Sequence, residues 1–81
     1  MTAAFVFIQI GGGQDFGGIS QVHTALHAVP GVKTVHFLAG PTDALAFVEV
    51  ADTAALMDAV GKIRTAKGVA GTDTRFVWPV H

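Results

Sequence analysis

The segment LAGPTDALAFVEV, Leu38–Val50, carries the strongest indication of the fold of this chain. Its first part, Gly40-Pro41-Thr42-Asp43, predicts a tight turn, because proline presets φ for the first inner position of a type I turn and glycine and aspartate commonly flank it. Its second part, Ala44–Val50, predicts a strand that is apolar on both faces apart from Glu49. A strand of this kind has to be covered on both sides. The remaining sequence must supply the two covers.

Alternating apolar residues and helical periodicity predict the elements on either side of this hairpin. They are, in chain order, a strand over Ala4–Ile10, a helix from about Ile19 with Asp15 as N-cap, a strand over Val32–Ala39, a helix capped by Asp52 or Thr53, and a strand over Thr72–Val80. Pro30-Gly31 and Gly68 end the two helices at equivalent positions, so the chain reads as a repeat. The order predicts an α+β fold, a ferredoxin-like βαββαβ sandwich with the first and third strands in the centre.

The two predicted helices cover only one face of this sheet. The other face carries the apolar side chains of Phe5, Phe7, Leu45 and Phe47. Apolar patches of this size are rare on the surface of a monomer. We therefore expect a second copy to supply the missing cover and form a dimeric α+β barrel. The alternative is a monomer with an exposed apolar sheet face.

The composition excludes several classes of protein. The chain has 81 residues, a size typical of a single domain, and no cysteine, which excludes disulfides and thiolate metal sites. A net charge of −1 leaves no basic excess for direct binding of nucleic acid. The longest apolar run, Ala3–Ile8, is far shorter than the roughly 20 residues of a membrane-spanning helix. We expect a soluble, cytoplasmic domain that does not contact a membrane.

No motif for catalysis, metal binding or cofactor binding is found. The glycines from Gly11 to Gly18 do not form a dinucleotide motif, because Phe16 occupies the position of the third glycine. His23 and His27 have a spacing that can chelate a metal, but no carboxylate lies one turn away on the same helix face. No nucleophile and base share a suggestive spacing. The sequence thus predicts no catalytic residue, no metal and no cofactor.

Asp43 is the most informative acidic residue. A carboxylate beside an open backbone turn suits a ligand with an ammonium group, because the carboxylate pairs with the cation and main-chain groups bind the rest. The alternative is that Asp43 only bonds the backbone of its own hairpin. The residues by themselves leave both interpretations open.

An ordered set of short motifs extends this picture over the chain from about Ala4 to Val77. The motifs are Pro30–Val35, Ala39–Asp43, Ala46–Val50, Ile63-Arg64, Gly68-Val69 and Thr72–Thr74. Together they resemble the C-terminal effector domain of the Lrp/AsnC family of transcriptional regulators, also called the RAM domain. The family's βαββαβ fold agrees with the fold predicted from the residues.

The resemblance implies a non-enzymatic domain that binds an amino acid, dimerises through its sheets and assembles further into octamers or other rings of dimers. By position it implies ligand contacts from Gly40, Thr42 and Asp43, although Thr42 stands where the family commonly has an aromatic residue. Asp52, Thr72 and Thr74 are expected as further contacts from their neighbourhood. Since the first strand begins near Ala4, we expect a stand-alone effector domain, without a DNA-binding domain, that modulates transcription by assembling with full-length relatives.

Two other functions fit the same fold. The first is a small dimeric α/β-barrel enzyme, such as a monooxygenase or isomerase, with His36, Trp78 and a carboxylate in a cavity between sheet and helices. The second is an assembly module whose pocket no longer binds a ligand. A cavity lined by His36 and a carboxylate would favour the enzyme.

Overall fold

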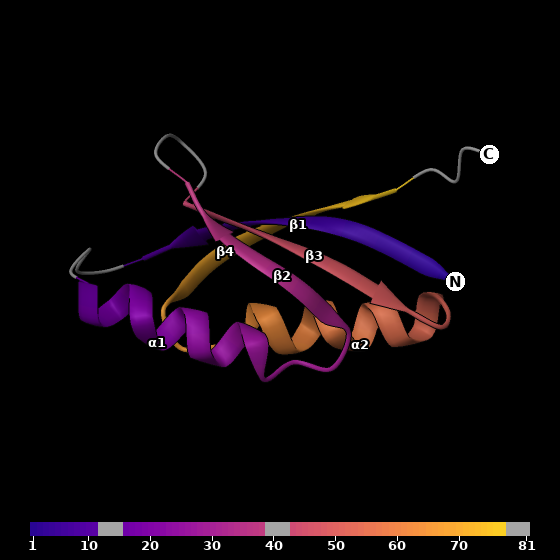
Figure 1. Cartoon of the computed structure of the whole chain (residues 1–81), viewed down its shortest axis with the longest axis horizontal. Helices are drawn as coiled ribbons and strands as arrows, with labels where there is room; N and C mark the ends of the chain where they lie inside the picture. Colours follow the sequence, from indigo (N-terminus) through magenta and orange to yellow (C-terminus); the bar gives the residue numbers. More distant parts are fainter. Residues whose placement is uncertain (12–15, 39–42, 78–81) are drawn as a thin grey trace.

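The computed structural model describes residues 1–11, 16–38 and 43–77 (Figure 1). Its elements are β1 (Thr2–Ile10), α1 (Phe16–His27), β2 (Val32–Phe37), β3 (Ala44–Val50), α2 (Thr53–Arg64) and β4 (Val69–Phe76). The order confirms the predicted βαββαβ arrangement.

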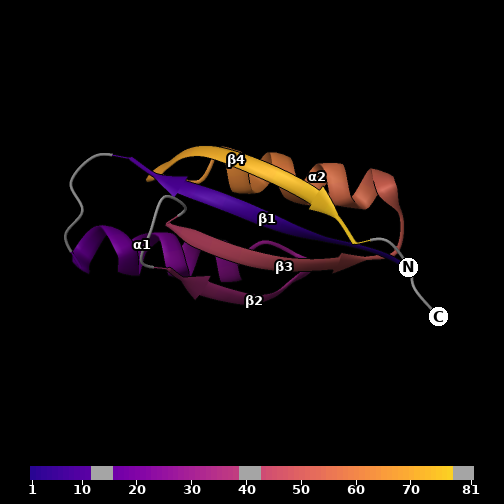
Figure 2. The ribbon, with the colours of Figure 1, turned by 90° about the horizontal axis from the view of Figure 1, so that it is seen from above.

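The four strands form one antiparallel sheet in the order β2-β3-β1-β4, so the first and third strands are central, as predicted. Both helices lie on the same face of this sheet, and no described helix or strand covers the other face (Figure 1). Seen from above, β4 and β2 form the two edges (Figure 2). In the central pair, Phe5 lies opposite Phe47 and Val6 lies opposite Ala46.

Several predicted boundaries differ from the structure, and β1 begins at Thr2, two residues before the predicted Ala4. The last strand begins at Val69 instead of Thr72, because β1 pairs with it from Ile10 onward and extends it through Gly71. The first helix begins at Phe16, directly after the predicted N-cap Asp15 and three residues before the apolar pattern that starts at Ile19, and β2 ends at Phe37 instead of Ala39. Trp78 and Asp15 lie outside the described residues. At the start of β4, pairing with β1 overrides the low strand preference of Gly71.

The core lies between the sheet and the helices. It is formed by the inward side chains of β1 and β3 and by the apolar stripe of each helix: Ala4, Val6, Ile8, Val22, Leu26, Val29, Ala44, Ala46, Val48, Leu56, Ala59, Val60 and Ile63. Gly31 and Gly68 follow the helices with φ of 97° and 96°, a region that favours glycine. The two predicted helix stops are thereby confirmed.

The uncovered face of the sheet carries the aromatic residues that the alternation predicts. Phe5 is 40% exposed, and its ring centroid lies 5.0 Å from that of Phe47. We call the side chains of Phe5, Phe7, Leu45 and Phe47 the open face. None of the helices in the described part of the chain is long and apolar enough to cross a membrane.

Candidate functional site

Asp43 joins three strands at one end of the sheet. Its backbone N–H donates to the carbonyl of Ile8 over 3.2 Å, and its carbonyl accepts from the N–H of Leu38 over 2.9 Å. Its carboxylate Oδ2 accepts from the backbone N–H of Ile10 over 2.9 Å. The side chain thus anchors the end of β1 to the start of β3.

This contact corrects the interpretation that Asp43 only bonds its own hairpin, and the ligand contact stays a prediction. Asp43 bonds the neighbouring strand β1 through its side chain, and not only its own hairpin. The residue is half-buried, and no described residue donates to its second carboxylate oxygen, Oδ1. One oxygen therefore has a structural partner in β1, and a carboxylate held in this way can also accept a charge-assisted hydrogen bond from an ammonium group.

The structure places only some of the other predicted ligand contacts near Asp43. Gly40 and Thr42 lie outside the described residues. Asp52 lies at the opposite end of β3, is exposed, and accepts from the N–H of Ala55 over 2.8 Å as the N-cap of α2. It is therefore not a neighbour of Asp43.

Thr72 and Thr74 lie on β4, opposite Ile8 and Val6, and so share the helix-covered face of the sheet. Ile8 also pairs with Ala44, which places Thr72 at the same end of the sheet as Asp43.

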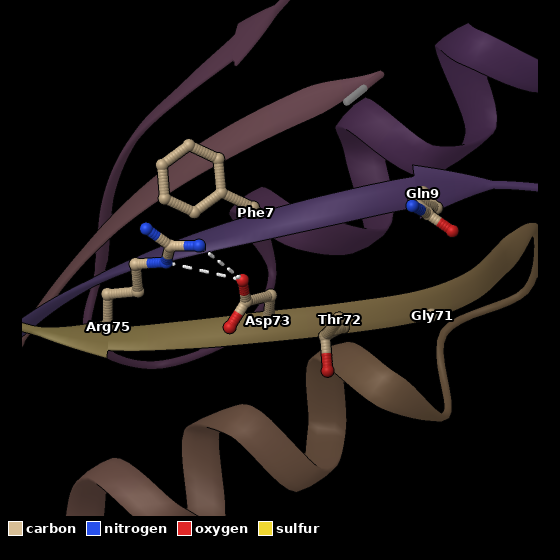
Figure 3. A pocket seen from close by; sticks show the side chains of 6 residues that line it. All are labelled: Phe7, Gln9, Gly71, Thr72, Asp73 and Arg75. Carbon is tan, nitrogen blue, oxygen red and sulfur yellow. Dashed lines mark hydrogen bonds and ion pairs between the residues drawn. The ribbon is translucent and has the colours of Figure 1, made fainter. Parts of the chain in front are cut away.

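A cavity of about 320 Å³ lies over β1 and β4 (Figure 3). It is lined by Phe7, Gln9, Gly71, Thr72, Asp73 and Arg75. Arg75 donates to Oδ2 of Asp73 through Nε over 3.2 Å and through Nη2 over 3.0 Å, and its guanidinium lies 5.3 Å from the ring centroid of Phe7. The sequence contained a signal for this ion pair: Asp73 and Arg75 have opposite charges and stand two residues apart on a strand, so their side chains share a face of the sheet.

A second, more open groove of about 600 Å³ lies between α2 and β4. It is lined by Met57, Val60, Arg64, Ala70, Gly71, Thr72 and Thr74. The groove contains no carboxylate and no histidine among the described residues, and Arg64 is its single charged side chain there. Thr72 and Thr74 therefore line a groove with one cation and several apolar side chains.

The histidines lie apart from these sites. His23 and His27 are exposed on α1, with ring centroids 4.5 Å apart, and His23 also contacts the ring of Phe37. Within the described ranges, no three histidine or acidic side chains gather as a metal site would require. His36 is exposed on β2 and lines neither cavity described above. The structure therefore offers no support for the predicted enzyme cavity around His36.

Comparison with known proteins agrees with the fold. The family model described as the Lrp/AsnC ligand binding domain matches residues 3–79. A search of curated proteins gave no match.

Several solved structures are similar over the full length of the chain. The protein TTHA0845 from Thermus thermophilus is 28% identical with a TM-score of 0.84, and the match covers 100% of this chain and 98% of that one. The hypothetical protein PHS023 from Pyrococcus horikoshii is 26% identical with a TM-score of 0.82, covering 100% and 94%.

A feast or famine regulatory protein from M. tuberculosis, solved in complex with L-methionine, is 25% identical with a TM-score of 0.77. The match covers 99% of this chain but 52% of that protein, so this chain spans about half its length.

Proposed function

The chain belongs to the Lrp/AsnC ligand-binding domain family, and we propose that it binds an amino acid as a non-catalytic effector domain that modulates transcription. The observation that carries the proposal is the half-buried carboxylate of Asp43 at the start of β3, with one oxygen bonded to Ile10. The relative solved with L-methionine supports an amino acid as the ligand.

In the proposed complex the α-ammonium group of the amino acid pairs with Oδ1 of Asp43. A charge-assisted hydrogen bond of this kind is stronger than a neutral one. Because Ile10 holds the other oxygen, the carboxylate is oriented before the ligand arrives, which lowers the entropic cost of binding. Gly40 and Thr42 contribute the remaining contacts by their position in the family's motif, and Asp52, Thr72 and Thr74 stay secondary candidates.

The open face supports a dimer as the working unit. Phe5 and Phe47 form an apolar surface on the central strands, and a second sheet packed at about 10 Å would bury it. We propose that two copies form an α+β barrel in this way. The dimers then assemble further into octamers or other rings, and with full-length relatives in the cytoplasm. Through these relatives, binding of the effector changes transcription, although this domain does not contact DNA itself.

Calorimetric titration with each of the twenty amino acids, starting with L-methionine, tests the ligand. We expect binding to the wild-type protein and a loss of at least about tenfold in Asp43→Asn, since the neutral amide keeps an acceptor for Ile10 but loses the charge. Arg75→Gln, which removes the cation of the other cavity, is the matched control and should bind normally. Unchanged binding in Asp43→Asn would contradict the site. Absence of binding at millimolar concentration, even with DNA-binding relatives present, would contradict the function.

Light scattering with and without amino acids tests the assembly. We expect a dimer at minimum, and a change in size or stability of the assembly when the effector binds. A stable monomer at micromolar concentration would contradict the barrel.

A further inference from the structure

The strand β4 forms a long edge of the sheet, and its pairing with β1 is regular from Gly71 to Phe76. No described strand pairs with its other side. The opposite edge, β2, is shorter and its pairing is irregular between Val32 and Thr34. Irregular, short edges resist the addition of another strand, whereas a regular edge presents unpaired N–H and C=O groups at alternate residues. Of the two edge strands, β4 is therefore better suited to pair with an additional strand.

The groove between α2 and β4 runs beside this edge. Seen from above, α2 lies along β4 and reaches beyond it (Figure 2). Two large apolar side chains are exposed on these two elements: Met57 in the groove is 59% exposed, and Phe76 near the end of β4 is 57% exposed. A strand added beside β4 would lie against α2 and cover part of this apolar surface.

The positive charge of Arg64 in the groove favours a ligand that ends in an anionic group. Arg64 is the last residue of α2 and lines the groove together with Ala70 and Gly71, at the start of β4. In the described part of the chain it forms no ion pair. Asp73 and Arg75 neutralise each other on the opposite face of the sheet. The groove therefore carries a positive charge at the end where β4 begins.

We propose that this groove binds an extended peptide as a fifth strand, antiparallel to β4, with the C-terminal carboxylate of the peptide at Arg64. Antiparallel pairing brings the C-terminal end of the added strand to the start of β4, where Arg64 lies. The main-chain hydrogen bonds supply affinity, and contacts between the groove and every second side chain of the peptide supply specificity. A second copy of this chain is a poorer occupant, because it brings its own α2 alongside its own β4 into the same space.

The lining defines the chemical class of the peptide. Its groove-facing side chains would lie opposite Thr72 and Thr74 and against Met57 and Val60, which suits β-branched or other medium-sized apolar residues. Its alternate side chains would share the face of Asp73 and Arg75, which is also the face of Phe5 and Phe7. Because β4 is an edge strand, they would lie at the margin of the proposed dimer interface and should be polar. The expected ligand is a C-terminal segment that alternates polar and apolar residues and ends in an apolar residue.

The test uses acetyl-Thr-Val-Thr-Val with a free C-terminus and the same peptide as its C-terminal amide, titrated into the ¹⁵N-labelled full chain. We expect chemical-shift changes in the amides of β4 and α2, and about fivefold tighter binding of the free acid, the upper range for an exposed ion pair. Arg64→Gln should abolish this difference. Lys62→Gln, on the same helix but outside the groove, should preserve it, as should Asp43→Asn.

Three results would overturn the proposal: shifts confined to the open face or to the Asp43 end, equal binding of acid and amide by the wild-type protein, or loss of the difference in Lys62→Gln. Displacement of the peptide by free L-methionine in the Asp43→Asn variant, where the amino-acid site at Asp43 is lost, would also overturn it and would assign the groove itself to an amino acid. The Asp43→Asn variant separates this inference from the proposed function, because it should lose amino-acid binding and keep peptide binding.

Discussion

The carboxylate of Asp43 accepts a hydrogen bond from the backbone N–H of Ile10 over 2.9 Å, across 33 residues of sequence. The pairing of β1 with β4 shifts register between Gln9 and Ile10, so the N–H of Ile10 lies at an irregular point of the sheet. The side chain of Asp43 satisfies this donor. The residue predicted as the ligand contact is therefore also part of the framework.

Asp43→Ala should destabilise the fold by about 2 kcal/mol, because hydrogen bonds to charged groups contribute about 1.5–3 kcal/mol and the N–H of Ile10 would lose its partner. Asp43→Asn should retain most of this stability, since the amide oxygen still accepts. Urea unfolding of both variants measures the difference. Equal stability of Asp43→Ala and wild type would show that the bond to Ile10 contributes nothing.

Gly31→Ala should lower the free energy of unfolding by about 2 kcal/mol. The residue has φ of 97°, and an added Cβ would lie 2.5 Å from Cγ1 of Val50. Gly61→Ala is the matched control: within α2 an added Cβ meets nothing within 4 Å, so the fold should gain about 0.5–1 kcal/mol from helix propensity. Thermal unfolding of the two variants should therefore shift in opposite directions.

Asp52→Ala should cost about 1 kcal/mol, because the N–H of Ala55 loses the oxygen that caps α2. Asp52→Ser keeps a capping oxygen and should remain close to wild type. Amino-acid titration of the same two variants shows whether Asp52 also contacts ligand. Loss of binding in both variants without loss of stability in Asp52→Ser would assign the residue a ligand role.

Phe5→Lys should weaken the proposed dimer by at least about tenfold while the monomer stays folded. The side chain is 40% exposed on the open face, where a charge can reach solvent in the monomer but would be buried between two sheets in the dimer. Met57→Lys changes an exposed apolar residue on the helix side and should leave the dimer intact. Sedimentation velocity measures both, and equal effects of the two variants would argue against the open face as the interface.

The type and order of the helices and strands could be predicted from the sequence alone. The alternation in Ala44–Val50 assigned each side chain of β3 to a face, and the helix stops at Gly31 and Gly68 followed from local backbone chemistry. The cap of α2 was predicted at Asp52 or Thr53 for the same reason, and the structure has it at Asp52, whose partner Ala55 is three residues away. These features depend on neighbours in the chain, and periodicity or composition encodes them.

The spatial neighbours of each side chain could be learned only from the folded structure. It tied Asp43 to Ile10, placed the guanidinium of Arg75 near the ring of Phe7, and opened the groove beside α2. The early start of β4 at Val69 also came from pairing with β1 and not from local propensity. The contacts of Asp43 with Ile10 and of Arg75 with Phe7 join residues far apart in sequence, and no local period specifies which distant strand a side chain will meet, because register and packing are properties of the folded sheet.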